Sequence, residues 1–137
     1  MENLFKYVGC FFEAEELYEK TKLIRESPLP MAVEYPHITF QYRPESVDRE
    51  LFGQKLQVEI VGYGNNGINE GLYVRVASSN SKLQAMVNKI EVPHITLALG
   101  EGGEAVNTRE LEFAEIPSII ITGEYGGCTE DRRVILK

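Results

Sequence analysis

The sequence predicts an α+β domain made of two similar strand–helix–strand units. Stretches that alternate like strands and stretches with helical spacing follow one another in the same order in both halves of the chain. The tetrad PHIT also occurs twice, at residues 36–39 and 93–96, at the same place in each unit. It contains the only two histidines of the protein, His37 and His94. A motif repeated at matching places predicts a duplication with pseudo-two-fold symmetry.

Length and composition indicate one soluble domain, residues 1–137. A chain of 137 residues with 43% hydrophobic and 26% charged residues is long enough to bury a core. No apolar run approaches the roughly 18 residues of a membrane span, and the N-terminus lacks the pattern of a signal peptide. We therefore expect a cytoplasmic monomer without a membrane segment.

The charge balance argues against a protein that binds long duplex DNA. The chain has 21 Asp and Glu against 14 Lys and Arg, a net charge of −7, whereas duplex binding needs many cations at phosphates. One phosphate needs only a local site, so a small phosphorylated ligand or a strand end is still compatible with this charge. Cys10 and Cys128 lie far apart and share no CxxC spacing, which predicts neither a zinc site nor a disulfide.

The chain is expected to begin with a strand and a helix. Residues 4–12, LFKYVGCFF, are rich in the aromatic and β-branched residues that favour strands. Residues 13–27 follow as a helix that two prolines close, Pro28 and Pro30. Its apolar residues recur at near-helical spacing: Leu17, Leu23 and Ile24.

Two further strands and a turn complete the first half. Residues 36–43 lie between prolines and alternate in character, which predicts a strand. Residues 54–65 alternate apolar Leu56, Val58 and Ile60 with Gln57, Glu59 and Val61, and predict a third strand. The segment GNNGINEG, residues 64–71, has the composition of a hairpin turn.

The second half repeats the order. Residues 71–78 predict a strand, residues 79–90 a short helix capped by serine or asparagine, and residues 92–100 the strand with the second tetrad. The tail then contains a glycine-rich loop and two strands, at residues 100–111, 118–127 and 132–137. Nothing in this order resembles a linker between domains.

Strand alternation places the polar residues of each tetrad on one face. Side chains two residues apart point the same way on a strand, so His37 shares a face with Thr39, and His94 with Thr96. If the halves are related by a pseudo-two-fold, the two pairs converge on one cleft from opposite walls.

Two histidines and two threonines in one cleft suit phosphoester chemistry. An imidazole titrates near neutral pH, so one histidine can act as general base while the other acts as general acid. Threonine hydroxyls can donate to the non-bridging phosphate oxygens. The sequence has no His/Asp/Glu cluster at ligand spacing, so we expect no metal and no cofactor. Which histidine is the acid stays open.

The segments HITF at residues 37–40 and HITL at residues 94–97 resemble the paired H-x-[ST]-x motifs of the two-histidine phosphoesterase superfamily. That resemblance implies a bilobal fold in which mostly antiparallel sheets line a central cleft and two helices lie outside. It also implies His37 and His94 as the acid/base pair and Thr39 and Thr96 as phosphate ligands. The chain is shorter and less basic than the bacterial RNA-ligase-like members.

Three other residues are weaker candidates for substrate binding. Tyr42 follows the first motif, with core packing as the alternative. Arg43 has the bidentate donor geometry for a phosphate, with an exposed strand end as the alternative. Tyr125 is followed by two glycines in GEYGG, where a ligand base can approach and stack on an aromatic ring.

The leading hypothesis is a metal-independent phosphodiesterase that acts on a 2′,3′-cyclic phosphate or a related nucleotide or RNA-end phosphodiester. A second enzymatic hypothesis is the degradation of a cyclic di- or oligonucleotide signal, as in viral immune-evasion members of the superfamily. RNA end ligation is a third, which the negative charge disfavours. A non-catalytic nucleotide-binding module is the alternative from another class.

Overall fold

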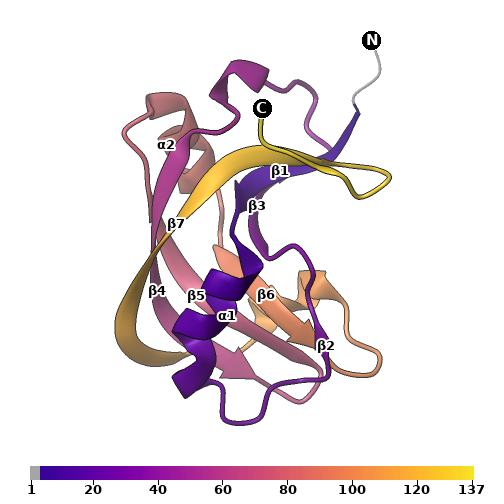
Figure 1. Cartoon of the computed structure of the whole chain (residues 1–137), viewed down its shortest axis with the longest axis vertical. Coiled ribbons are helices and arrows are strands. Elements are labelled where there is room, and N and C mark those ends of the chain that lie inside the picture. The colour runs from indigo at the N-terminus through magenta and orange to yellow at the C-terminus, as the bar shows by residue number, and fades with distance from the viewer. Residues whose placement is uncertain (1–3) are drawn as a thin grey trace.

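The computed structural model describes residues 4–137 and has an α+β architecture (Figure 1). Its two α-helices within this range are α1 (Ala14–Thr21) and α2 (Ser81–Asn88). Three short 3-10 helices accompany them: η1 (Lys22–Ile24), η2 (Arg49–Leu51) and η3 (Ala105–Glu110). The strands are β1 (Phe5–Phe11), β2 (Met31–Ala32), β3 (His37–Tyr42), β4 (Lys55–Asn65), β5 (Asn69–Ala77), β6 (His94–Leu99), β7 (Ala114–Thr129) and β8 (Val134–Ile135).

The strands form one antiparallel sheet in the order β2-β6-β5-β4-β7-β1-β3, and β8 pairs with β7. The long strands β4 and β7 lie at its centre, and Figure 1 shows β7 bending around one side of the molecule. The tetrad strands β3 and β6 lie near opposite ends of this order, yet some of their Cα atoms come within 8 Å of each other. The sheet therefore curves back on itself until its two ends meet.

The core lies against the central strand β4 and under the two α-helices. Alternate residues of β4 are buried, with Leu56, Val58 and Ile60 at most 1% exposed. Leu17 of α1 and Leu83 of α2 are fully buried in the same apolar cluster. The helices begin at side-chain caps, since Glu13 Oε2 accepts from the Glu16 N–H and Asn80 Oδ1 accepts from the N–H groups of Lys82 and Leu83.

The expected strands and helices are all present, with different limits for some. The helix expected over residues 13–27 ends at Thr21, and η1 continues it for one turn. Leu23 is 95% exposed. It lies in η1, after α1 has ended, so α-helical spacing from Leu17 does not set its position. The prediction that the apolar spacing included Leu23 is therefore wrong.

The tail differs from expectation in two elements. The strand expected over residues 118–127 starts earlier, at Ala114, and includes Pro117. Pro117 lies opposite the register shift between Ile60 and Gly62 of β4, where the ladder is interrupted and a residue without N–H is tolerated. The glycine-rich loop at residues 100–111 contains η3, and β2 was not anticipated.

Within residues 4–137, no helix combines the length and the apolar character that a membrane crossing requires.

Candidate functional site

Both tetrads line a single cleft with a cavity volume of about 820 Å³. His37 and Thr39 reach it from β3, and His94 and Thr96 reach it from β6. The side chains that sequence alternation predicted on one face of each strand therefore meet across a common space. Further lining comes from β1, from η3 and from the segment before β6: Lys6, Tyr7, Ile90, Glu91, Val92, Ala105, Val106 and Arg109 among others.

Each histidine is held by a contact with the backbone just before its own strand. Nδ1 of His37 lies 2.8 Å from the carbonyl oxygen of Tyr35, and Nδ1 of His94 lies 2.8 Å from that of Val92. A carbonyl oxygen only accepts, so both Nδ1 atoms carry the hydrogen, and Nε2 of the neutral ring has a free lone pair. Within residues 4–137 neither Nε2 atom has a hydrogen-bond partner. The tautomer that this contact selects is the one that can accept a proton at Nε2.

The prolines of the two tetrads also have equivalent partners. The carbonyl of Pro36 accepts from the Phe12 N–H at 3.2 Å, and the carbonyl of Pro93 accepts from the Val74 N–H at 3.1 Å. Each proline thereby joins its tetrad to the neighbouring strand just before the histidine. Proline has no backbone N–H group, and its absence is tolerated here because the residue lies at the start of a strand.

Each threonine of a tetrad lies opposite a glycine. Thr39 pairs with Gly9 of β1, and Thr96 pairs with Gly71 of β5, and in both cases the register shifts at the residue before the glycine. A Cβ atom on Gly9 would lie 2.0 Å from the carbonyl oxygen of Ile38, and one on Gly71 would lie 2.3 Å from Cγ2 of Thr108. Only glycine allows these approaches. The two strands that neighbour the tetrads therefore both need a residue without a Cβ atom opposite the threonine.

The two histidines have different surroundings. The ring of His37 stacks on Tyr7 with centroids 4.4 Å apart and lies 5.5 Å from the ring of Phe11. Burial lowers the pKa of His37 to about 4, the charge of His94 lowers it further, and the Tyr35 carbonyl opposes the shift. Burial also lowers the pKa of His94 below its usual range, and the positive charge of Arg109 adds to this effect. Both imidazoles are therefore neutral in the free protein at pH 7.

The two threonines differ as well. Oγ1 of Thr96 lies 2.8 Å from Oγ1 of Thr108 and 3.2 Å from the carbonyl oxygen of Ala105. Oγ1 of Thr39 has no hydrogen-bond partner among residues 4–137. Of the two hydroxyls in the cleft, that of Thr39 is thus the one with an uncommitted hydrogen.

Tyr42 lies at the mouth of the cleft. It belongs to the lining and is 60% exposed, so the alternative of core packing is wrong. The strand β3 ends at this residue.

Arg43 does not belong to the cleft lining. Its backbone has a positive φ of 48°, its side chain pairs with Glu130, and its guanidinium lies 5.4 Å from the centroid of the Tyr42 ring. This placement agrees with the alternative of an exposed strand end and offers no phosphate contact from Arg43.

Tyr125 is 2% exposed and lies in the core. Its ring packs against Phe40 and Phe52, with centroids 5.9 Å and 5.5 Å away. The expectation that it stacks on a ligand base is corrected by this packing, because the side chain points into the core and the following glycines bring the C-terminal residues Ile135 and Leu136 close.

For two residues, Tyr7 and Arg109, no sequence pattern predicted that they would line the cleft. Tyr7 lies in the expected first strand, but only the pairing of β1 with β3 brings it onto His37. Arg109 belongs to a segment that reads as a glycine-rich loop, and it reaches the cleft through the packing of η3 against β6. Contacts between elements distant in sequence decide both positions.

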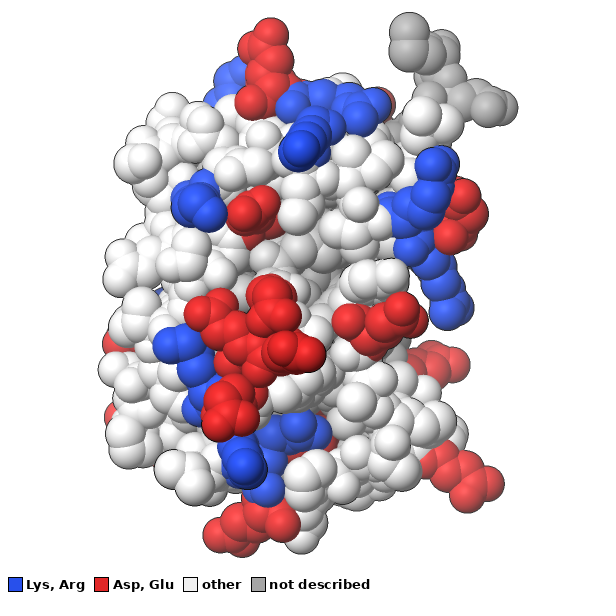
Figure 2. Space-filling view, in the orientation of Figure 1, with Lys and Arg blue, Asp and Glu red and all other residues white. Residues whose placement is uncertain are grey.

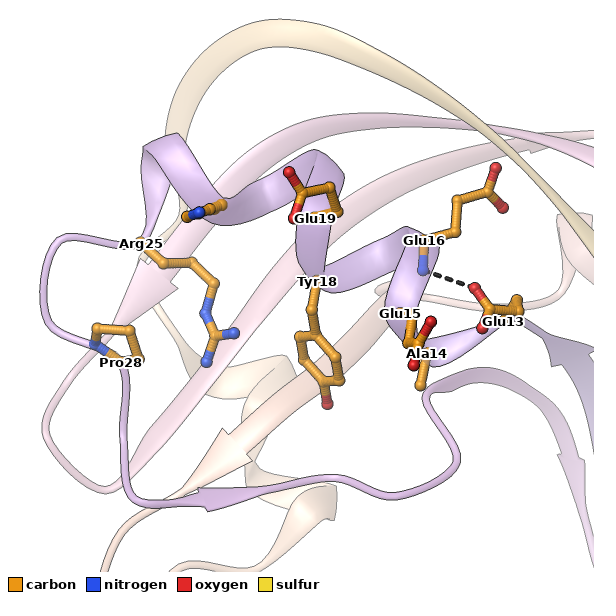
Figure 3. A pocket seen from close by; sticks show the side chains of 9 residues that line it. Glu13, Ala14, Glu15, Glu16, Tyr18, Glu19, Arg25 and Pro28 are labelled. Carbon is orange, nitrogen blue, oxygen red and sulfur yellow. Dashed lines mark hydrogen bonds between the residues drawn. The ribbon is translucent and has the colours of Figure 1, made fainter.

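A second hollow lies beside α1 and contains no histidine (Figure 3). Its lining includes four glutamates, Glu13, Glu15, Glu16 and Glu19, and Figure 2 shows acidic side chains gathered over this helix. Carboxylates also line the tetrad cleft, but only that cleft contains the two imidazoles, so it is the better candidate for acid–base chemistry.

No protein-family model matches the chain, and no curated protein matches it.

Proposed function

We propose that the protein is a two-histidine phosphoesterase and a metal-independent phosphodiesterase. Its substrate is a 2′,3′-cyclic phosphate or a related small nucleotide or RNA-end phosphodiester. The observation that carries the proposal is the matched pair of tetrads: two imidazoles with the same tautomer, each two residues from a threonine, on facing strands of one cleft.

The strand order supports a duplicated, bilobal domain. In β6-β5-β4-β7-β1-β3, exchange of β3 with β6, β1 with β5 and β4 with β7 reverses the order and leaves it otherwise unchanged. The exchange also relates β1-α1-β3 to β5-α2-β6, and it relates the two glycines opposite the threonines. A pseudo-two-fold between β4 and β7 accounts for all of these correspondences.

The mechanism uses the two histidines in opposite roles. One neutral imidazole accepts a proton at Nε2 from the attacking water, and the resulting nucleophile forms a bond to phosphorus. The bond between phosphorus and the departing ribose oxygen breaks, and the protonated second imidazole supplies the proton which that oxygen needs. The anionic phosphate raises the pKa of a nearby imidazole, so substrate binding itself favours protonation of the acid.

The test is hydrolysis of nucleoside 2′,3′-cyclic monophosphates in the presence of EDTA. We expect ring opening in the wild type and a loss of about 100- to 10,000-fold in kcat/KM in His37→Ala and in His94→Ala. Because the pKa of each histidine is lowered, kcat/KM should be bell-shaped in pH with its maximum below 6.5. Loss of activity in EDTA, or full activity in either variant, would contradict the mechanism.

A cyclic di- or oligonucleotide is the second candidate substrate. The cavity volume of about 820 Å³ lies near the upper end of the range of roughly 300–1,000 Å³ for small-molecule sites, which favours a ligand larger than one nucleotide. A panel of cyclic mononucleotides, cyclic dinucleotides and 2′-5′-linked oligonucleotides separates the two. Tight binding of a nucleotide without turnover across a broad pH series would instead indicate a non-catalytic binding module.

A further inference from the structure

The hydroxyl hydrogen of Thr96 is already used inside the protein. A hydroxyl carries one hydrogen, and a carbonyl oxygen only accepts. Asn69 Nδ2 donates to Oγ1 of Thr108 at 3.0 Å, and the Thr96 hydroxyl donates to the same Thr108 oxygen at 2.8 Å. The carbonyl oxygen of Ala105, 3.2 Å from Oγ1 of Thr96, is a second acceptor for that hydrogen. The single hydrogen of Thr96 thus has two acceptors inside the protein, and none is left over for a phosphate oxygen.

The same polar chain anchors η3 against the sheet. Asn69 Nδ2 also donates to the carbonyl of Glu104 at 2.8 Å, so β5 holds the start of the segment while β6 holds it at Ala105. Thr108 is fully buried, and Asn69 is 2% exposed. Buried hydrogen bonds have little competition from water, and a connected set of them restrains the backbone that carries it.

The residue after Thr108 is Arg109, which lines the cleft together with both histidines. Its charge acts on His94, since it contributes to the lowered pKa of that imidazole. Its ion pair with Glu110 spans 3.6 Å, and the two side chains are 58% and 72% exposed. Exposed pairs of this kind contribute little free energy, so the guanidinium is available to an anion in the cleft.

We propose that Thr39 and Arg109 bind the phosphate oxygens in this cleft, and that Thr96, Thr108 and Asn69 are positioning residues that hold Arg109 there. The inference rests on the proposed function, because it takes a phosphoester as the ligand. It departs from the symmetric expectation in which both threonines of the tetrads contact the phosphate.

Arg109 and Thr39 differ in how many phosphate oxygens each can bind. A guanidinium binds two oxygens of one phosphate side by side, whereas a hydroxyl binds one. The side of the cleft that carries Arg109 therefore selects for a phosphoester whose two non-bridging oxygens are both unsubstituted. A phosphotriester or a neutral phosphoramidate ester of similar shape should bind poorly.

The test measures binding of adenosine 3′-monophosphate by calorimetry, with adenosine as the uncharged comparison. We expect Arg109→Ala to weaken binding of the monophosphate about 10- to 100-fold, with little change for adenosine. Arg109→Lys should recover only part of the loss, because an ammonium lacks the paired donors. Arg75→Ala is the matched control, since Arg75 is 74% exposed and does not line the cleft. Equal affinity of Arg109→Ala and wild type would overturn the inference.

A double-mutant comparison separates positioning from direct contact. If Thr96 only positions Arg109, Thr96→Val weakens binding in the wild type but adds nothing further in the Arg109→Ala background. Thr39→Val, in contrast, should weaken binding about equally in both backgrounds. Thr96→Ser retains the hydroxyl and should bind like the wild type, which also controls for failure of Thr96→Val to fold. An undiminished effect of Thr96→Val without Arg109 would mean that Thr96 touches the phosphate.

The outcomes distinguish this inference from the proposed function. If the wild type turns over a cyclic phosphate and Arg109→Ala does so with unchanged KM and kcat, only the inference is wrong. If the wild type binds the monophosphate through Arg109 but hydrolyses nothing, the inference holds and the enzymatic proposal is wrong. If the wild type neither binds nor hydrolyses a phosphoester, both are wrong.

Discussion

The two walls of the cleft contain the same four residues and differ in what surrounds them. Around the first tetrad, His37 lies against the rings of Tyr7 and Phe11, and the hydroxyl of Thr39 has no partner among residues 4–137. Around the second, Thr96 belongs to a buried polar chain with Thr108. The tetrad sets the local backbone and the tautomer of its histidine, while the elements packed against it determine pKa and hydrogen bonding.

The largest effects on activity should come from the two histidines, one on each wall. We expect His37→Gln and His94→Gln each to lower kcat/KM for a 2′,3′-cyclic phosphate by at least about 100-fold, because each removes a proton-transfer group. The double variant should be little worse than either single variant, since both groups act in one step. Steady-state kinetics with thermal unfolding as a control for folding give the comparison. A variant that keeps most of its activity would show that the two walls are not equivalent in the chemistry.

The next largest effects should come from the glycines opposite the threonines. Gly9→Ala should destabilise the protein by about 3 kcal/mol, because its Cβ would meet a backbone oxygen. Gly71→Ala should cost about 2 kcal/mol, since its Cβ would meet Cγ2 of Thr108 and the backbone oxygen of Ile95, and it should also weaken phosphate binding by moving η3. Urea unfolding measures both.

Gly67→Ala is the control for these two variants. A Cβ on Gly67 meets nothing within 4 Å, but its φ is +86°, so this change reports backbone strain alone, about 1 kcal/mol. Losses at Gly9 and Gly71 no larger than that at Gly67 would show that the close approaches are not tight.

A smaller effect should appear in the pH dependence of the free energy of unfolding, and it should come from His37. The pKa of His37 is about 4 in the folded protein and about 6.5 in the unfolded chain. As pH falls below 6.5, the unfolded state binds a proton that the folded state does not bind until about pH 4, so the free energy of unfolding decreases. The slope is about 1.4 kcal/mol per pH unit. Between pH 6.5 and 5, wild type should therefore lose about 2 kcal/mol more than His37→Gln.

Urea unfolding of the two proteins at several pH values provides the measurement. The carboxylates titrate in both, so their contribution cancels in the difference. Parallel curves for wild type and His37→Gln would show that burial does not lower the pKa of this histidine.

The smallest effect should come from the exposed aromatic of the first wall. Tyr42→Ala should weaken binding of adenosine 3′-monophosphate about 5-fold, because a base that stacks on an exposed ring gains about 1 kcal/mol. Binding of inorganic phosphate should not change. Tyr125→Phe is the matched control, since Tyr125 lies in the core. If Tyr42→Ala weakened the binding of inorganic phosphate equally, Tyr42 would not act by stacking on the base.

Much of the architecture could be predicted from local pattern. The alternation in β3, β4 and β6 and the Asn80 cap of α2 are short-range properties, and the structure shows each of them. The burial of Tyr125 could not be predicted in this way. It depends on which side chains from distant elements fill the space around the ring, such as Phe40 and Phe52.

By itself, the sequence determined that two His/Thr pairs share the faces of two strands, because side-chain alternation is a property of the extended backbone. Only the tertiary structure decided that the two strands meet, that aromatic rings lower the pKa of His37 by excluding water, and that Thr108 occupies the hydroxyl of Thr96. These depend on the curvature of the sheet and on the packing of η3, which no local pattern encodes.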